Sequence, residues 1–267
     1  DTKGMQTSGK KLPGAYGANE PKQNAANLRT KGWELMLTWN DAFKLANKPF
    51  RYNLSVGLAD NTSEITKFDN PSKILSDYYV GQKLGDIWGY VVDGLFRTDE
   101  EAANYNVDQT AVNFVINTAQ VNPGLHAGDM KFVDLDGDHT ISSGSNTADD
   151  PGDRKIIGNS LPRYTYSIQG GFDWYGFDFS IYLQGVGHQD WYPGTNSVFF
   201  WGPYARPYSS FIPRDFLSQV WSPENPDAYF PRPIGYLALG NNRSLGVVND
   251  RYLQNLAYCR VKNITVG

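Results

Sequence analysis

Apolar and polar residues alternate one by one in several segments, and this alternation limits the possible folds more than any other feature. The clearest case covers 177–186, where Phe177, Phe179, Ile181 and Leu183 are separated by single polar residues. A period of two places successive side chains on opposite sides of a β-strand. Together with 164–174, across a tight turn at 174–177, this segment predicts a β-hairpin with one apolar and one polar face.

Three further strands are predicted near 33–40, 50–58 and 252–266, and a slip in the last one predicts a β-bulge near Asn263. The connections 41–49 and 174–177 are short, whereas 60–163 and 187–250 are long. In an antiparallel meander, this order puts the short turns at one end and the long loops at the other. Segments of such length are expected to be folded, and Thr98 followed by Glu101 predicts a helix start within the first of them.

Two fold classes carry strands of this kind. No run of 18 apolar residues exists, so a membrane-spanning helix is excluded, but the strands of a membrane β-barrel alternate and look polar on average. The loop asymmetry favours an all-β, antiparallel transmembrane β-barrel segment with short periplasmic turns and long extracellular loops. A β-sandwich would show the same alternation. In the barrel, the predicted lumen-facing residues are Asn53, Ser55, Asp178, Ser180, Tyr182 and Gln184.

Composition narrows the function. The net charge is −4 with scattered basic residues, which argues against a nucleic-acid-binding face. The aromatic content of 14% suits half-buried β surfaces, binding faces or membrane-interface belts. The three histidines lack metal-ligand spacing, and no phosphate loop or nucleophile motif appears, so no enzyme activity is predicted. The chain starts in polar sequence and stops inside an apparent strand, and we therefore expect a piece of a longer protein.

An acidic stretch in the first long segment has carboxylates at every second position, as in the first half of an EF-hand-type loop. Ca²⁺ or Mg²⁺ is therefore a candidate ligand. Two positions depart from that pattern, since His139 replaces the usual glycine and Ser145 the usual acid. The alternative is a polar turn held by side-chain hydrogen bonds without metal. The candidate metal ligands are Asp134, Asp136, Asp138, the carbonyl of Thr140, and Asp153.

Aromatic residues cluster in the second long segment. They are candidates for stacking on a sugar or for packing against a partner, and the alternative is that they pack the loop on itself. The candidate substrate-binding residues are Trp191, Tyr192, Trp201 and Tyr204.

Four stretches together resemble a known family. They are KLGDIWGYVVDGLF (83–96), GDMKFVDLDGD (128–138) followed by DRKIIGNSLPRYTYSIQGGFDWYGFDFSIYLQGVGHQD (153–190), VWSPENPDAYFPR (220–232) and YLQNLAYCRVKNITVG (252–267). In this order they resemble the C-terminal barrel portion of SusC/RagA-type TonB-linked outer-membrane transporters. The chain departs from the family at His139 and at residues 145–152, which look inserted.

The resemblance implies active import of an oligosaccharide or peptide across the outer membrane of Bacteroidota, without bond chemistry. It further implies a multi-pass barrel among outer-membrane lipids, a SusD-like surface lipoprotein that lids the barrel, and TonB acting through a plug and a contact segment that have no counterpart here. By this resemblance the chain is the last third or quarter of such a protein. Two other hypotheses remain open: a secreted Ca-binding β-sandwich that binds or cleaves glycans, and a barrel that serves as an adhesin or receptor without transport.

Overall fold

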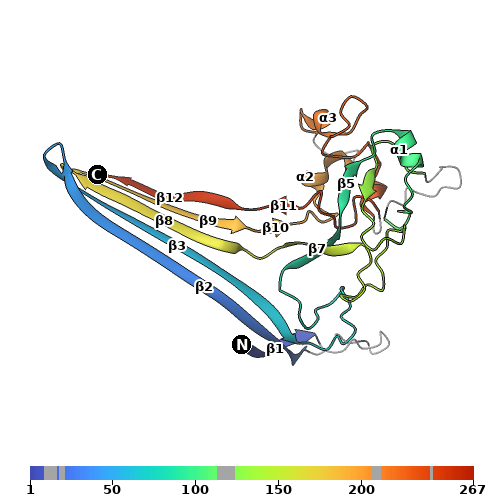
Figure 1. Ribbon diagram of the computed structural model, residues 1–267, viewed down its shortest axis with the longest axis horizontal. Helices are drawn as coiled ribbons and strands as arrows, with labels where there is room; N and C mark the ends of the chain where they lie inside the picture. Colours follow the sequence, from blue (N-terminus) through green and yellow to red (C-terminus); the bar gives the residue numbers. More distant parts are fainter. Residues whose placement is uncertain (9–16, 18–21, 113–123, 206–211, 241–242) are drawn as a thin grey trace.

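The computed structural model describes residues 1–8, 17, 22–112, 124–205, 212–240 and 243–267. Its largest element is one sheet of long strands that run side by side from a turn end to a loop end, where the short elements gather (Figure 1). Every neighbouring pair in this sheet is antiparallel. In spatial order its strands are β1 (Thr2–Ser8), β2 (Lys22–Leu45), β3 (Lys48–Lys67), β8 (Arg163–Trp174), β9 (Phe177–His188) and β12 (Tyr258–Val266).

Two tight turns join the hairpins at the same end of the sheet (Figure 1). Ala46 and Asn47 lie between β2 and β3 with φ of 50° and 61°. Tyr175 and Gly176 lie between β8 and β9 with φ of 51° and 84°. Two central residues with positive φ give the turn type whose twist matches that of the flanking strands. The short connections therefore all lie opposite the long ones, as the loop lengths indicate.

Two strand predictions were too short and one was too long. β2 continues well beyond 33–40 at both ends, and β3 begins two residues before 50 and continues nine residues beyond 58. Outside the apolar stretch both faces of these strands carry polar residues, so the alternation that marks a strand in the sequence fades. β12 begins at Tyr258 rather than at Tyr252, because Tyr252 is fully buried among the loops. The β-bulge is confirmed by the register shift between Val261 and Asn263.

One face of the long sheet is apolar across five strands. A single row runs through Leu37, Val56, Ile168, Leu183 and Val261, each directly opposite the next. The described residues include no second sheet packed on this face, since the other sheets have two strands each and belong to the loops. The β-sandwich alternative requires a second layer over the apolar side, and the described residues supply none.

Aromatic residues border the apolar face at both ends. Near the turns, Phe50 and Phe172 stack with ring centroids 5.4 Å apart within a larger cluster. At the loop end, Trp33 and Tyr166 lie on the same face. Trp33 and Phe43 are ten residues apart on β2, which is roughly 33 Å along the strand and would be about 25 Å of height for strands tilted by about 40°, as barrel strands are.

The two long connections fold together into one loop domain with a shared core. From the first connection come Met130, Phe132 and Ile141, and from the second Trp201 and Leu245, all fully buried. The elements of this domain are β4 (Asp86–Tyr90), β5 (Val92–Leu95), α1 (Asp99–Ala103), β6 (Met130–Phe132), β7 (Arg154–Asn159), β10 (Asp190–Trp191), α2 (Val198–Trp201), η2 (Gly202–Tyr204), α3 (Phe216–Gln219), η3 (Tyr236–Leu239) and β11 (Gln254–Asn255). The predicted helix start is confirmed, because Thr98 Oγ1 accepts the Glu101 N–H at the beginning of α1.

Polar contacts tie the two connections to each other. Arg232 donates to the fully buried carboxylate of Asp129 over 2.6 Å and 3.3 Å. Tyr90 N–H donates to the carbonyl of Val248, and Val92 N–H donates to Asp250. The loop domain is therefore one packed unit and not two independent excursions.

No helix in the described part of the chain is both long and apolar enough to cross a bilayer.

Candidate functional site

The polar face of the long sheet brings the six predicted lumen-facing residues together. Asn53 and Ser180 flank Gly171 in one cross-strand row, and Ser55 and Tyr182 flank Gln169 in another. A Cβ on Gly171 would lie 3.4 Å from Asn53 Nδ2 and 3.5 Å from Ser180 Cβ, so both side chains stand on this face. The remaining two, Asp178 and Gln184, share its register on β9.

On β3, β8 and β9 the middle of this face is uncharged, whereas the flanking strands place Glu34 opposite Ala59 and Arg260 opposite Gln184. Between Asn53 and Ala59 on β3, and along the matching lengths of β8 and β9, hydroxyl, amide, glycine and small apolar residues stand on the polar side. Charged residues appear at the turn end, where Asp173 lies between Arg51 and Asp178 in one row. The part of this surface on β3, β8 and β9 can therefore hydrogen-bond a neutral polar solute along its length, with charged groups confined to the flanking strands and the turn end.

The acidic stretch forms a tight loop in which Asp134, Asp136 and Asp138 each place a carboxylate oxygen within 4.8 Å of the others. The Asp134 carboxylate accepts the N–H groups of Gly137 and His139 at 2.7 Å and 2.9 Å. His139 adopts a φ of 64°, so it takes the left-handed turn that the family pattern gives to glycine. The carboxylates and the tight loop fit a hard cation, and these hydrogen bonds also shape the loop without one.

The pKa values of two of these carboxylates move in opposite directions. Desolvation raises the pKa of Asp134, but backbone N–H donation from His139 and Gly137 outweighs it and leaves the pKa below its usual value. The backbone N–H of Asp138 lowers the pKa of Asp136, yet desolvation and the charges of Asp153, Asp138 and Asp134 together raise it. The loop therefore concentrates negative charge at Asp136, which is what a bound cation would neutralise.

Asp153 has a different role from the one predicted. It is fully buried, and its two oxygens accept the N–H groups of Leu135 and Ser142, each at 2.7 Å. Its carboxylate thus joins both ends of the acidic loop and is not one of the three that cluster. The candidate ligand set reduces to the three clustered carboxylates together with the carbonyl of Thr140.

The four aromatic candidates separate into interior and surface residues. Trp201 and Tyr204 are 0% and 3% exposed, and burial raises the pKa of Tyr204. Trp201 Nε1–H donates to Gly194 O, and Tyr204 OH donates to Pro231 O. Both residues lie in the loop-domain core, so the expectation that they stack on a substrate is wrong for this structure. Tyr192 is half-buried and bonds Val247 O, whereas Trp191 is 42% exposed.

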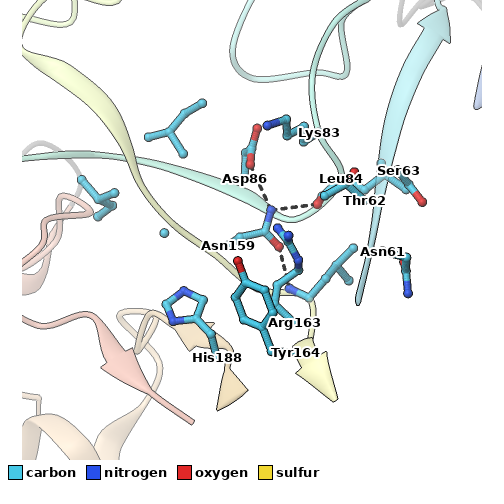
Figure 2. A pocket seen from close by; sticks show the side chains of 14 residues that line it. Asn61, Thr62, Ser63, Lys83, Leu84, Asp86, Asn159, Arg163, Tyr164 and His188 are labelled. Carbon is cyan, nitrogen blue, oxygen red and sulfur yellow. Dashed lines mark hydrogen bonds between the residues drawn. The ribbon is translucent and has the colours of Figure 1, made fainter. Parts of the chain in front are cut away.

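A cleft of about 480 Å³ lies where the long sheet meets the loop domain (Figure 2). At its base Arg163 donates to both oxygens of Asp60, each over 2.6 Å. Asn159 Nδ2 donates to Leu84 O and to Asp86 Oδ1, both at 2.9 Å. The sequence contains no local signal for this site, because Asp60 and Arg163 are 103 residues apart.

Comparisons with known proteins agree with the strand pattern. No family model matches the chain. TonB-dependent receptors P39 and P3 of Formosa agariphila are 24% and 23% identical to it, each over 96% of the chain. The structure of the RagAB peptide transporter superposes with a TM-score of 0.55 at 14% identity, over 96% of the chain. The chain spans about a quarter of the length of these proteins (25%, 23% and 24%). The predicted resemblance is therefore confirmed: over nearly its whole length the chain is similar to a barrel portion of SusC/RagA-type TonB-linked outer-membrane receptors.

Proposed function

We propose that this chain forms part of the wall and the outer loops of an outer-membrane transporter that imports a polar nutrient with energy from TonB. The observation that carries the proposal is the two-faced sheet. Its apolar face is bordered by aromatic residues about 25 Å apart, which is the height of the lipid-facing band of outer-membrane barrels. Its other face is polar, as a water-filled lumen requires.

The orientation follows from the loop asymmetry. Short turns lie on the periplasmic side of such barrels and long loops outside. The turns at 46–47 and 175–176 would face the periplasm, and the loop domain would stand on the cell surface. There it could meet a SusD-like lipoprotein and the incoming substrate. TonB would act through a region outside this chain.

The lumen lining bears on the substrate class. Asn53, Ser55, Gln169, Ser180 and Tyr182 supply amide and hydroxyl groups and no charge. On these strands the lining suits an oligosaccharide, whose hydroxyl groups can exchange partners along the wall, while Glu34 and Arg260 add one charge of each sign on the flanking strands. No bond chemistry is needed, because these residues only bind and release. A bound Ca²⁺ at Asp134, Asp136 and Asp138 would neutralise the loop and hold its shape outside the cell.

Fractionation and uptake of the native full-length protein test the proposal. We expect it in detergent-extracted outer membranes as a species whose electrophoretic mobility changes on heating, because a folded barrel resists detergent. We also expect uptake of a nutrient oligosaccharide that stops when TonB is removed. Recovery as a soluble monomer would contradict the barrel. A heat-modifiable barrel without TonB-dependent uptake would point instead to an adhesin or a surface receptor.

A further inference from the structure

Three stretches of chain cross side by side between the long sheet and the loop domain. They are 159–163 between β7 and β8, 188–190 between β9 and β10, and 255–258 between β11 and β12. Gln189 joins all three, because its side-chain Nε2 donates to Ser160 O at 3.0 Å and its carbonyl accepts Leu256 N–H at 2.7 Å. The position of the loop domain on the sheet therefore depends on how these crossings hold one another.

One buried carboxylate fastens two of the crossings. Asp190, whose side chain is 7% exposed, accepts Asn159 N–H at 2.9 Å through Oδ2. The same oxygen lies 2.9 Å from His188 Nε2. A Cβ on Gly158 would lie 2.5 Å from this oxygen, so the carboxylate packs directly against the backbone of β7. We call His188, Asp190 and the Asn159 N–H the junction clamp.

His188 gives the junction clamp a group that can exchange protons with water. Its side chain is 45% exposed and lines the cleft of Figure 2 together with Tyr164 and Asn159. Histidine is the side chain whose charge ordinarily changes between about pH 5 and about pH 8. A protonated ring attracts the Asp190 carboxylate, and the burial of that carboxylate limits the screening of the attraction by water and salt.

The charges around His188 leave Asp190 as its counter-ion. Among the described residues, Asp190 is the acid within ion-pair distance of His188. Arg163 lies opposite His188 in the register of β8 and β9, but its guanidinium donates to both oxygens of Asp60 on β3. The other titratable groups around the cleft and at the third crossing are Lys83, Asp86, Tyr164 and Tyr258.

We propose that the junction clamp makes the attachment of the loop domain to the long sheet pH-sensitive. When His188 is protonated, its charge holds Asp190 in place on the Asn159 N–H, and the two crossings stay together. As the pH rises through the range in which histidine titrates, that charge is lost and the carboxylate is left with the Asn159 N–H. The stabilisation is therefore present at the acidic end of this range and lost at the alkaline end, so the junction opens more often at higher pH.

Hydrogen exchange of the native full-length protein in detergent tests the proposal, because the Asn159 N–H is itself part of the junction clamp. Exchange is followed at about pH 5 and at about pH 8 and is divided by the intrinsic chemical rate at each pH. In wild type, protection of 156–161 should be about fivefold higher at the lower pH, as expected for one half-exposed ion pair. His188→Gln stays neutral and should show the same protection at both pH values.

Three comparisons make the result specific. Asp190→Asn removes the charge at nearly constant shape and should also abolish the pH dependence. His126→Gln is the matched control, because His126 Nδ1 lies 3.6 Å from Asp99 Oδ1 outside the crossings and both side chains are exposed. This control should keep the wild-type difference at 156–161. Segment 130–132 lies in the loop-domain core and should show no comparable change, because it reports opening of the whole domain.

Several outcomes would overturn the proposal. They are equal protection of 156–161 at the two pH values in wild type, and a fivefold difference that persists in His188→Gln. A change of the same size in 130–132 also overturns it, because the whole loop domain would then respond to pH. Heat-modifiable mobility shows that each variant is folded.

The proposed function is tested separately from the junction clamp. Only the placement of the clamp at the outer surface of the membrane, where it meets the pH of the surroundings, rests on that function. TonB-dependent uptake that persists when the exchange pattern is absent leaves transport intact while the clamp proposal fails. The expected exchange pattern without uptake leaves the clamp intact while transport fails.

Discussion

Replacing one residue of β2 with arginine tests which face of the sheet meets lipid. Leu37 is 60% exposed on the apolar face, and its neighbour Met36 is 71% exposed on the polar face. Both are unbranched or γ-branched apolar residues at nearly the same height. Leu37→Arg and Met36→Arg therefore introduce the same charge at the same depth on opposite sides of one strand.

The expected size follows from position. Leu37 is four residues from Trp33 and six from Phe43, or roughly 10 Å and 15 Å from the two aromatic borders for strands tilted by about 40°. It thus lies close to the bilayer midplane, where arginine on the lipid face costs about 2–4 kcal/mol. Leu35 is only two residues from Trp33, about 5 Å from the border, and Leu35→Arg should cost about 1 kcal/mol or less. Met36→Arg should cost about 0.5 kcal/mol or less, because it stays in water.

Denaturant unfolding of the full-length protein refolded into lipid vesicles measures these free energies through tryptophan fluorescence. The loss of unfolding free energy should be largest for Leu37→Arg, smaller for Leu35→Arg and smallest for Met36→Arg. If Met36→Arg costs as much as Leu37→Arg, the sheet has no lipid-facing side. If it costs more, the faces are inverted, and the six predicted lumen residues face lipid.

Three further changes probe the loop domain. Arg232→Ala should destabilise the loop domain by about 3–5 kcal/mol, because it leaves Asp129 charged and buried. Arg97→Ala breaks the exposed ion pair with Asp227 and should cost about 1 kcal/mol or less. Hydrogen exchange of residues 124–132 measures both effects, and equal protection in the two variants would contradict the role of burial. Trp201→Ala should lower the free energy of unfolding by about 3–5 kcal/mol, because it leaves a cavity in the loop-domain core, and Trp191→Ala should lower it far less. Thermal unfolding followed by near-UV circular dichroism measures both. Similar losses of stability in the two variants would mean that Trp191 is also a core residue. Calcium binding at the acidic loop should weaken as the pH falls, and should begin to do so above the usual aspartate range, because Asp136 with its raised pKa takes up a proton first. The support from Asp134 persists until the pH falls through its lowered pKa. Calorimetric titration measures the affinity, and protection against proteolysis that chelation leaves unchanged would rule out the cation.

The strand faces could be predicted from the sequence, and the strand ends could not. Between Trp33 and Trp39 every second residue is apolar, as a strand between lipid and water would require. Beyond the aromatic border at the loop end, both faces of β2 and β3 carry polar residues, so side-chain polarity no longer reveals the alternation of the strand. A different reason explains the predicted start of the last strand at Tyr252: an apolar residue at the right spacing looks like a strand residue even when it fills a loop core.

The loop sites depend on contacts between distant residues. Trp201 and Tyr204 have the composition of a ligand-stacking pair, but they pack with Phe230 and Tyr252, which lie far along the chain. The spacing of Asp134, Asp136 and Asp138 indicated a cluster, and the structure has one. Nothing in that spacing shows that Asp153 is occupied by two backbone N–H groups, because its partners lie 11 and 18 residues away.

The shared core of the two long connections also governs the order of folding. Val92 N–H finds its acceptor on Asp250, 158 residues later. The entropy of closing so large a loop opposes that contact until the intervening chain is ordered, and the hairpin of β8 and β9 lies in between. Local turns let the hairpins pair early. The loop domain can complete its core only after the second connection has been synthesised and brought beside the first, so it should be the last part of this chain to become protected from exchange or protease during biogenesis.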